Sequence, residues 1–540
     1  MKKKLLSLLL ITAMAVVMLA GCSKGGDKDT QAAVTTAGGE TTKGAETEGQ
    51  TTAGADEQAQ TVTMWTWKGT EELMKMDTKD VMAVQEISKR TGVPTEWINP
   101  ADSTTEFQML MTSGENMPDA MYYKYTPQDV MNYAANGNII DLSKYIEEKI
   151  PNLQKLLDEN PRLKAQVTSE DGAIYYLPWI TLDKYYYEGL MIRKDWLEAT
   201  GLDVPTNNEE LYQVLKAEKE LFDKGELPNA GEKFYGLGGY PTQLIKLAYG
   251  FDATNDFMLK DGKVVYGPTT DEFRAAMKWF NKLAAEGLLD PDVLSMDRDV
   301  YMQHHVNNMT SGFVDGYGAF QEVEQQTENI EYVPVGYMAN AAGQINEYNS
   351  TAKRIAQPYG WAITKAGEEK IDEICKLFDY SYSEEGQILM SWGIEGDTFE
   401  VVDGKKVYTD KIMKDPEYVP GTAVAKYVKP DFGLTDVQTN FALIDERGQT
   451  TFDMWANTDP SNAMEPFLWT SADENDTITQ IKTDLTTGAD EYREKFMTGA
   501  ADPADDAVWA EFQKTLTALR VDEICSVYDA AYQRFAQRAK

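Results

Sequence analysis

The sequence predicts an α/β fold with at least two lobes. Residues 61–540 keep a globular composition throughout, and this length exceeds what one hydrophobic core usually holds together. In the first part of this stretch, short runs rich in β-branched and aromatic residues alternate with amphipathic helical patterns. Such alternation is typical of a parallel sheet with helices on its faces. We find no repeat of fixed period, which argues against a solenoid or a propeller.

The chain begins with a leader-like segment. Three lysines precede an apolar run over residues 5–19, which is shorter than the roughly 20 residues that a membrane-spanning helix needs. We therefore interpret residues 1–21 as a signal peptide. The run "LAGC" ending at Cys22 resembles the lipobox of bacterial lipoproteins, in which the cysteine becomes the N-terminus and carries lipid such as palmitate. An ordinary secretory signal with a chance cysteine is the alternative.

Residues 22–60 predict a disordered tether. Thr, Gly, Ala, Glu and Gln dominate this segment, which has no aromatic residue and cannot bury enough apolar surface to offset the entropy of ordering. Without residues 1–21 the chain has 48 basic and 88 acidic residues, a net charge of −40. This balance argues against nucleic acid as a partner.

The first strand is predicted at residues 61–67, "TVTMWTW". Alternation along a strand places Trp65 and Trp67 on one side of it. We expect Trp65 in the core and Trp67, nearer the carboxyl end of the strand, at the mouth of a ligand crevice. The elements that follow are a helix at 79–92, a strand at 93–98, a helix at 105–115 and a strand at 119–125.

Two later helices carry clear end signals. Thr206 and Glu209 have capping-box spacing at the start of a helix that we expect to end at Gly225, and Thr269 and Glu272 repeat the spacing at the next long helix. Asp-Gly dipeptides, which suit two-residue turns, predict hairpins at residues 261–262 and 403–404.

The sequence offers little for catalysis. The two histidines, His304 and His305, are adjacent, so on a helix they point about 100° apart and cannot face one metal ion. Nucleophile-elbow, dinucleotide and P-loop patterns are absent. A hydrolase that uses a carboxylate pair stays open, because 88 acidic residues allow many pairs. Cys375 and Cys525 lie in helical patterns and are interpreted as buried apolar residues.

Aromatic residues stand in unusual settings, beside Gly, Pro or Asp and outside helical stripes. For a single aromatic residue, core packing is the ordinary explanation. A flat ring also stacks on the C–H face of a sugar, while carboxylates and amides bind the hydroxyl rim. As a set these residues predict a carbohydrate groove. They include Trp65, Trp67, Tyr122, Tyr123, Tyr175, Tyr176, Trp179, Tyr185, Tyr186, Tyr187, Tyr240, Tyr317 and Trp361.

Five stretches carry a family resemblance: "YAANGNIIDLSKYIEEKIPNL", "SEDGAIYYLPW", "GLMIRKDWLEATGLDVPTNNEELYQVLKA", "FNKLAAEGLLDPD" and "YGWAITKAGEEKIDEICKLFDYSYSEEGQILMSWGIEG". They resemble the sugar-type (family 1) extracellular solute-binding lipoproteins of bacterial ABC importers, in particular their long subgroup. The resemblance implies the two-lobe periplasmic-binding-protein-like fold of type II, with the ligand cleft between the lobes. It also implies hinge closure on the ligand, a permease that recognises the closed form, and no reaction.

The resemblance also implies lobe boundaries and ligand-facing residues. "YYLPW" resembles the first crossing between lobes and "PYGWAIT" the return crossing, whereas "GGYPTQ" and "GFVDGYGAF" resemble second-lobe loops that face the ligand. We expect lobe 1 at residues 61–182 and 357–415, and lobe 2 at 183–356 and 416–540. The expected ligand-binding residues are Trp67, Tyr123, Trp179, Tyr240, Asp315, Tyr317 and Trp361.

One departure from the family concerns calcium. Many long relatives have an acidic loop that resembles a calcium site after the helix matching residues 209–222. This chain has "LFDKGELPNAGEKFYGL" there, without the i, i+2, i+4 spacing of oxygen donors that a calcium loop uses. We therefore predict no structural calcium, no other metal and no cofactor.

The leading prediction is a lipid-anchored monomer on the outer face of the bacterial cytoplasmic membrane. It would capture a carbohydrate, expected to be an oligosaccharide, and deliver it to the permease subunits of an ABC importer, touching the membrane through its lipid only. The alternatives are a surface glycan-active hydrolase, and the same fold binding a peptide or another polar solute.

Overall fold

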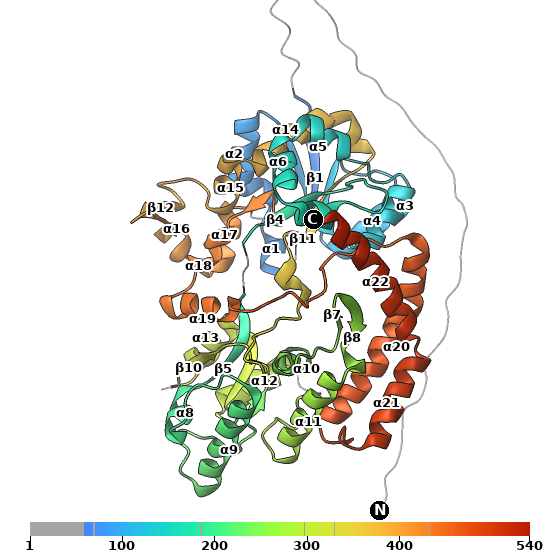
Figure 1. Ribbon diagram of the computed structural model, residues 1–540. Coiled ribbons are helices and arrows are strands. Elements are labelled where there is room, and N and C mark those ends of the chain that lie inside the picture. Colours follow the sequence, from blue (N-terminus) through green and yellow to red (C-terminus); the bar gives the residue numbers. More distant parts are fainter. Residues whose placement is uncertain (1–58, 69–70, 184–185, 296, 329, 430) are drawn as a thin grey trace, which may run out of the picture. The chain divides into compact units, whose positions relative to one another are not determined.

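The computed structural model describes residues 59–68, 71–183, 186–295, 297–328, 330–429 and 431–540. The predicted signal peptide at 1–21, Cys22 and residues 23–58 of the predicted tether lie outside these ranges. Two sheets organise the remainder (Figure 1), and each carries its own helices. We refer to them as the first lobe, around the six-stranded sheet, and the second lobe, around the four-stranded sheet.

The first lobe is built on a mixed sheet with the strand order β14-β4-β11-β3-β1-β2. Strands β1, β2 and β3 pair in parallel, and β11 lies antiparallel between β3 and β4. Its strands are β1 (Val62–Thr66), β2 (Thr95–Ile98), β3 (Ala120–Lys124), β4 (Leu177–Thr181), β11 (Ala356–Ile363) and β14 (Leu434–Thr435). The helices of this part are α1 (Glu71–Lys75), α2 (Met82–Thr91), α3 (Ser103–Ser113), α4 (Pro127–Ala135), α5 (Ser143–Lys149), α6 (Pro151–Glu159), α7 (Pro161–Val167), α14 (Ile371–Tyr382), α15 (Glu384–Ser391), α16 (Asp410–Met413) and α17 (Pro420–Tyr427).

Both faces of the first sheet are buried, because neighbouring residues on each strand enter different cores. Met64 and Tyr122 pack into one cluster, over which α5, α6 and α14 lie together (Figure 1). Trp65 and Met121 pack into the other cluster with Phe107 of α3. Trp65 is fully buried, so its predicted core position is confirmed. The two-sided burial is what a sheet covered by helices on both faces requires.

The second lobe has a four-stranded sheet with the order β10-β5-β9-β6. Strand β5 pairs antiparallel with β9 and β10, and β6 joins β9 in parallel. The strands are β5 (Glu188–Arg193), β6 (Leu237–Gly238), β9 (Gly312–Gly316) and β10 (Tyr332–Val335), and a hairpin adds β7 (Phe257–Lys260) and β8 (Lys263–Tyr266). A second hairpin, β12 (Phe399–Val402) and β13 (Lys405–Tyr408), packs with α16 and α17 of the first lobe. The helices are α8 (Lys194–Thr200), α9 (Asn208–Lys224), α10 (Pro241–Leu244), α11 (Asp271–Ala285), α12 (Arg298–Val306), α13 (Tyr317–Gln326), α18 (Gln438–Phe441) and α19 (Glu446–Ala456).

Three long C-terminal helices complete the second lobe: α20 (Ala472–Met497), α21 (Asp506–Ala518) and α22 (Val521–Arg538). They lie side by side in red in Figure 1, with α11 next to α20, and their buried residues join the main core of the second lobe. Helix α22 also contacts α7 of the first lobe. The end of the chain therefore touches both lobes.

The structure corrects three details of the sequence prediction. The first sheet is mixed rather than parallel, because β11 returns to it from the second lobe and enters in the opposite direction. Helix α9 is capped by Asn207, with Glu210 bonded to Thr206, one residue later than expected, and α11 is likewise capped by Thr270. Helix α17 and strand β14 fall in the predicted lobe 2 range, yet α17 contacts α1 and α2 and β14 pairs with β4 of the first sheet.

Other local predictions are confirmed. Helix α9 ends at Gly225, which adopts a left-handed φ of 72°. The hairpins β7–β8 and β12–β13 turn on the expected Asp-Gly pairs, both of whose residues have positive φ. Cys375 and Cys525 are unbonded thiols; Cys375 is buried as predicted, whereas Cys525 is half-buried. Partial or full burial raises their pKa to about 12 for Cys375 and about 11 for Cys525. Within the described ranges, every helix is too short or too polar to cross a membrane.

Candidate functional site

A cavity of about 660 Å³ lies beside the segments that follow β4, β10 and β14 and run between the two lobes. Strands β4, β11 and β14 of the first sheet contribute Trp179, Gln357 and Thr435 to its lining, and β5 of the second sheet contributes Glu188. Its volume falls in the range of about 300–1,000 Å³ that is usual for small-ligand sites. The cavity is therefore the candidate functional site.

Aromatic side chains form part of the wall. Trp179 is half-buried on β4, and its indole N–H donates to the hydroxyl of Thr435, which fixes the plane of the ring. Tyr187 is 49% exposed, and Tyr337 donates from its hydroxyl to the backbone oxygen of Glu188 at 3.3 Å. Tyr186 also lines the cavity. These rings offer flat apolar faces, and the polar groups of Trp179 and Tyr337 are already engaged with the protein.

Charged groups of both signs face the same space. Lys246, which is buried, forms an ion pair with Glu188. Arg354 precedes β11, and burial lowers the pKa of its guanidinium. Burial together with the neighbouring Glu188 carboxylate raises the pKa of Tyr187 to about 12, so its hydroxyl stays protonated and can donate. Asp183 and Glu347 add two further carboxylates to the lining.

Neutral hydrogen-bonding groups fill the gaps between these charges. Asn349, Gln357 and Asn440 supply amides, and Thr181, Thr351 and Thr439 supply hydroxyls. A pocket with aromatic faces, amides, hydroxyls and paired charges can hold a molecule that is itself amphipathic and rich in hydroxyls. Among the residues that the structure describes, no cluster of His, Cys, Asp and Glu could hold a metal ion. The expected absence of calcium stays a prediction.

Of the seven ligand-binding residues expected from the sequence, Trp179 lines the cavity. Three others belong to the aromatic core of the first lobe. Trp67 stacks on Tyr359 with ring centroids 5.2 Å apart, and Tyr123 stacks on Phe107 at 3.7 Å. Trp361 is only 1% exposed and sits edge-on to a neighbouring indole at 5.7 Å. These three lie outside the set of residues that lines the cavity.

The remaining three lie together in the second lobe. The ring of Tyr240 is 5.1 Å from that of Tyr301, whose hydroxyl donates to Asp315 at 2.9 Å. Tyr317 is buried, and its hydroxyl donates to Asp445 at 2.8 Å. The backbone N–H of Tyr317 donates to the backbone oxygen of Tyr187 at 2.9 Å, which ties this group to the cavity wall. A ligand contact at any of the seven positions stays a prediction.

Sequence reasoning missed the five charged members of the cavity, namely Asp183, Glu188, Lys246, Glu347 and Arg354. Four of them lie in loops or at the start of a strand, and none belongs to a motif. The signal that could have found the place was the tyrosine run before β5, whose Tyr186 and Tyr187 were in the aromatic set and line the cavity.

Two sheets joined by crossing segments, with a polar and aromatic cavity beside those segments, are the architecture of a two-lobe solute-binding protein. The chain belongs to the bacterial extracellular solute-binding protein family, whose model matches residues 77–388. The family expected from the sequence stretches and the two-lobe periplasmic-binding-protein-like fold are thereby confirmed.

Two characterised relatives and one solved structure illustrate the similarity. The fructooligosaccharide ABC transporter substrate-binding protein FusA of Streptococcus pneumoniae serotype 4 is 27% identical over 353 residues, or 60% of this chain and 62% of FusA. Lipoprotein LipO of Bacillus subtilis strain 168 is 27% identical over 349 residues, or 62% of this chain and 67% of LipO. The alginate-binding protein AlgQ2, in a crystal structure without calcium ion, aligns over 89% of this chain and 99% of its own, with 23% identity and a TM-score of 0.67.

The reach of these similarities differs. The match to FusA spans less than two thirds of the length of FusA. The likeness to AlgQ2 shows the fold. The matched family, FusA and AlgQ2 all carry names of binding proteins.

Proposed function

We propose that this protein captures an oligosaccharide and delivers it to an ABC importer. The observation that carries the proposal is the cavity itself, in which the fixed ring of Trp179 stands among amides, hydroxyls and the ion pair of buried Lys246 with Glu188. Sugars present an apolar C–H face and a rim of hydroxyls, and this lining offers partners for both. Membership of the solute-binding family and the fructooligosaccharide named for FusA support the same ligand class.

Capture would work by closure of the two lobes. A ligand that touches the linings from both sheets favours the arrangement in which both can reach it, since only differential contact shifts an equilibrium. The permease subunits would then recognise the closed form. In this proposal the protein acts as a monomer, the ligand leaves unchanged, and no enzymatic step takes place. The lobes would comprise residues 61–182 with 357–415 and 183–356 with 416–540, apart from α17 and β14, which belong to the first lobe.

We also propose that the protein is exported and anchored by lipid. Residues 1–21 would be removed, Cys22 would carry the lipid, and residues 22–60 would tether the folded part to the outer face of the cytoplasmic membrane. Similarity to LipO, a protein named as a lipoprotein, supports this proposal. The test is mass spectrometry of the mature N-terminal peptide. A lipid-modified Cys22 is expected, whereas an unmodified N-terminus at another residue would contradict the anchor.

The ligand class is tested by titrating the full chain, purified in detergent, with a panel of neutral and acidic mono- and oligosaccharides and of peptides. Binding is followed by isothermal calorimetry and by the fluorescence of Trp179 and the other indoles. We expect an oligosaccharide to bind and to raise the melting temperature. If only peptides bind, the carbohydrate proposal fails.

The same samples test the hydrolase alternative. Asp183, Glu188 and Glu347 give the cavity three carboxylates, and a pair of carboxylates is what glycoside hydrolysis requires. Chromatography of the bound glycan after prolonged incubation should recover it intact. Products that accumulate with time, and that a Glu347→Gln variant no longer forms, would establish an enzyme instead.

A further inference from the structure

One arginine of this protein differs from all the others in its partners. Of eleven arginines in the chain, ten form an ion pair with a carboxylate. Arg354 is the exception among the described residues, and it is also the arginine that lines the cavity. Its Nε is buried without a hydrogen-bond partner in the described part of the chain. The exception therefore coincides with the candidate site.

The neighbouring residue shows that a carboxylate was within reach of this segment. Lys353 donates to the backbone oxygens of Ser461 at 3.1 Å and Ala463 at 2.6 Å, and pairs with the buried Glu465 at 3.4 Å. Lys353 thus points into the protein and is neutralised there. Arg354, next in the chain, faces the cavity and keeps its charge uncompensated.

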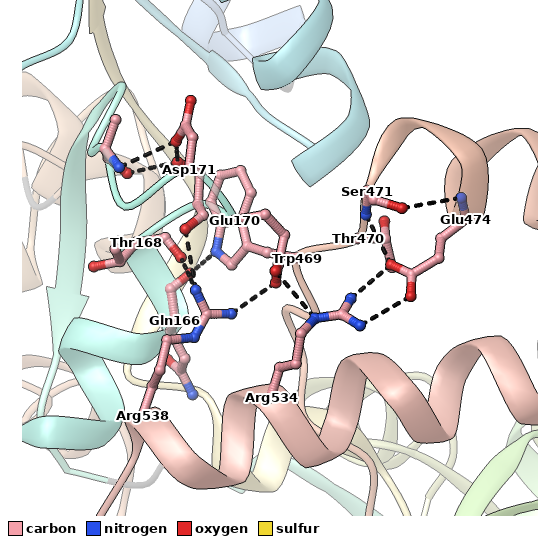
Figure 2. Close-up of polar contacts among 12 residues, drawn as sticks. Gln166, Thr168, Glu170, Asp171, Trp469, Thr470, Ser471, Glu474, Arg534 and Arg538 are labelled. Carbon is pink, nitrogen blue, oxygen red and sulfur yellow. Dashed lines mark hydrogen bonds and ion pairs between the residues drawn. The ribbon is translucent and has the colours of Figure 1, made fainter.

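The backbone that presents Arg354 is held firmly. The side chain of Gln166, which is fully buried, accepts from the N–H groups of Ile355 and Ala356 at 3.0 Å each and donates to the backbone oxygen of Lys353 at 2.8 Å. Figure 2 shows that Gln166 is in turn bonded through its own backbone oxygen to the indole of Trp469, at 2.9 Å. A fixed backbone lowers the entropy lost when Arg354 engages a ligand.

The groups around Arg354 do not neutralise it. Tyr187 and Tyr359 are the titratable side chains that influence its guanidinium, and both are neutral phenols at physiological pH. The nearby Glu188 is already paired with Lys246. Arginine is not deprotonated in proteins, so a half-buried guanidinium without a counter-ion is a favourable binding site for an anion. The fork of its N–H groups matches a carboxylate in two parallel hydrogen bonds.

We propose that Arg354 binds the carboxylate of an acidic sugar, so that the cavity selects oligosaccharides that contain a uronic acid. This inference rests on the proposed capture of a carbohydrate. Trp179 would stack on the ring of the sugar, and Asn349 and Gln357 would bind its hydroxyls. Arg354 would bind the carboxylate, which is the group that distinguishes a uronic acid from a neutral hexose.

The test compares two ligands that differ in that group alone. Trigalacturonate and the galactose trisaccharide of the same linkage are titrated by calorimetry into the full chain and into Arg354→Gln. We expect the natural chain to bind trigalacturonate at least tenfold more tightly. Arg354→Gln should lose at least tenfold for trigalacturonate and less than twofold for the neutral trisaccharide. Arg298→Gln, which removes an arginine paired with Glu322 outside the cavity, is the matched control and should change neither affinity.

Arg354→Lys keeps the charge but lacks the paired N–H groups, so its affinity for trigalacturonate should fall between those of the natural chain and Arg354→Gln. This variant also provides the test if Arg354→Gln is too unstable to titrate. Equal affinity of the natural chain for both trisaccharides, or an equal loss for both in Arg354→Gln, overturns the acidic subsite and leaves carbohydrate capture standing. Failure of every saccharide to bind overturns the proposed function, and this inference with it.

Discussion

The cavity and the C-terminal end of α22 both join parts of the two lobes, yet they treat arginine in opposite ways. In Figure 2, Arg534 forms two parallel hydrogen bonds with Glu474, at 2.9 and 2.6 Å, and a third with Glu170 at 3.0 Å. Arg538 pairs with the other oxygen of Glu170 at 2.9 Å and also donates to backbone oxygens. Arg354 in the cavity has no such partner within the described residues.

The difference separates a structural use of arginine from a binding use. At α22 the guanidinium N–H groups bind carboxylates of the protein itself, and these ion pairs hold α22 against α20 and the turn after α7. At the cavity the N–H groups of Arg354 would instead bind a ligand. Removal of an α22 arginine should therefore change stability, whereas removal of a cavity group should change affinity.

The contrast between the α22 arginines and Arg354 would carry no functional meaning if this fold commonly contained unpaired buried charges. Glu218 of α9 tests that, because it is fully buried and both of its carboxylate oxygens lack a hydrogen-bond partner in the described structure. Arg193 lies near it but is already bound to Asp195 and Asn308. Burial raises the pKa of Glu218 to about 8, so this group avoids an unpaired charge by keeping its proton at neutral pH.

Glu218→Gln is expected to give the largest effect. Between the ordinary pKa of 4.5 and the folded value of about 8, the unfolded chain releases a proton that the folded chain retains, so stability falls as pH rises through this window. The amide carries no such penalty. The gain in free energy of unfolding of Glu218→Gln over the natural chain should be near zero below pH 4.5. It should reach roughly 3 kcal/mol at pH 7, at about 1.4 kcal/mol for each pKa unit.

Urea unfolding of both proteins at pH 5, 7 and 8 measures this effect. Glu220→Gln, an exposed position on the same helix, is the control and should follow the natural chain. Stability curves that stay parallel from pH 5 to 8 would mean that Glu218 is charged in the folded state. Unpaired buried charge would then be ordinary in this protein, and Arg354 would lose its distinction.

The double change Arg534→Met and Arg538→Met should come next in size. It removes the bidentate pair with Glu474 and both bonds to Glu170, and a partly exposed network of this kind contributes on the order of 2 kcal/mol. The melting temperature should fall, and the affinity for the best glycan of the panel should stay within twofold. Arg520→Met, at the start of α22 and paired with exposed Glu523, should leave both nearly unchanged. A large loss of affinity would assign α22 to ligand capture and erase the contrast.

Trp179→Ala should show the reverse pattern. The indole is half-buried against the cavity, so its loss should weaken the best glycan about tenfold, or about 1.4 kcal/mol. The melting temperature of the free protein should change much less than for the α22 double variant. Trp179→Phe keeps a flat ring and should recover most of the affinity. If Trp179→Ala lowers stability and leaves binding intact, Trp179 is a core residue.

The sequence predicted features that depend on neighbouring residues, and it did not predict features that depend on how distant parts of the chain come together. The end of α9 at Gly225 and the turn at Asp261-Gly262 depend on neighbouring residues, and both were predicted correctly. The antiparallel entry of β11 depends on how the chain returns from the second lobe, which no short pattern encodes. Lys246 and Arg354 come together in the cavity from positions more than a hundred residues apart, so their shared environment is visible only in the folded chain.

Trp67 gives the smallest expected effect, and it bears on how far the binding region extends. Strand β1 ends at Thr66, and the Trp67 ring stacks on Tyr359, which is one of the two phenols that influence Arg354. Trp67→Ala should therefore loosen Tyr359 and weaken trigalacturonate by about threefold, or about 0.7 kcal/mol, through the position of Arg354. Calorimetry with the neutral trisaccharide should show no change. Because the ring is half-buried and its neighbours keep their other contacts, the fold should persist, which near-ultraviolet circular dichroism checks. An equal loss for both trisaccharides would instead place Trp67 in direct contact with the sugar ring, as the sequence alone predicts.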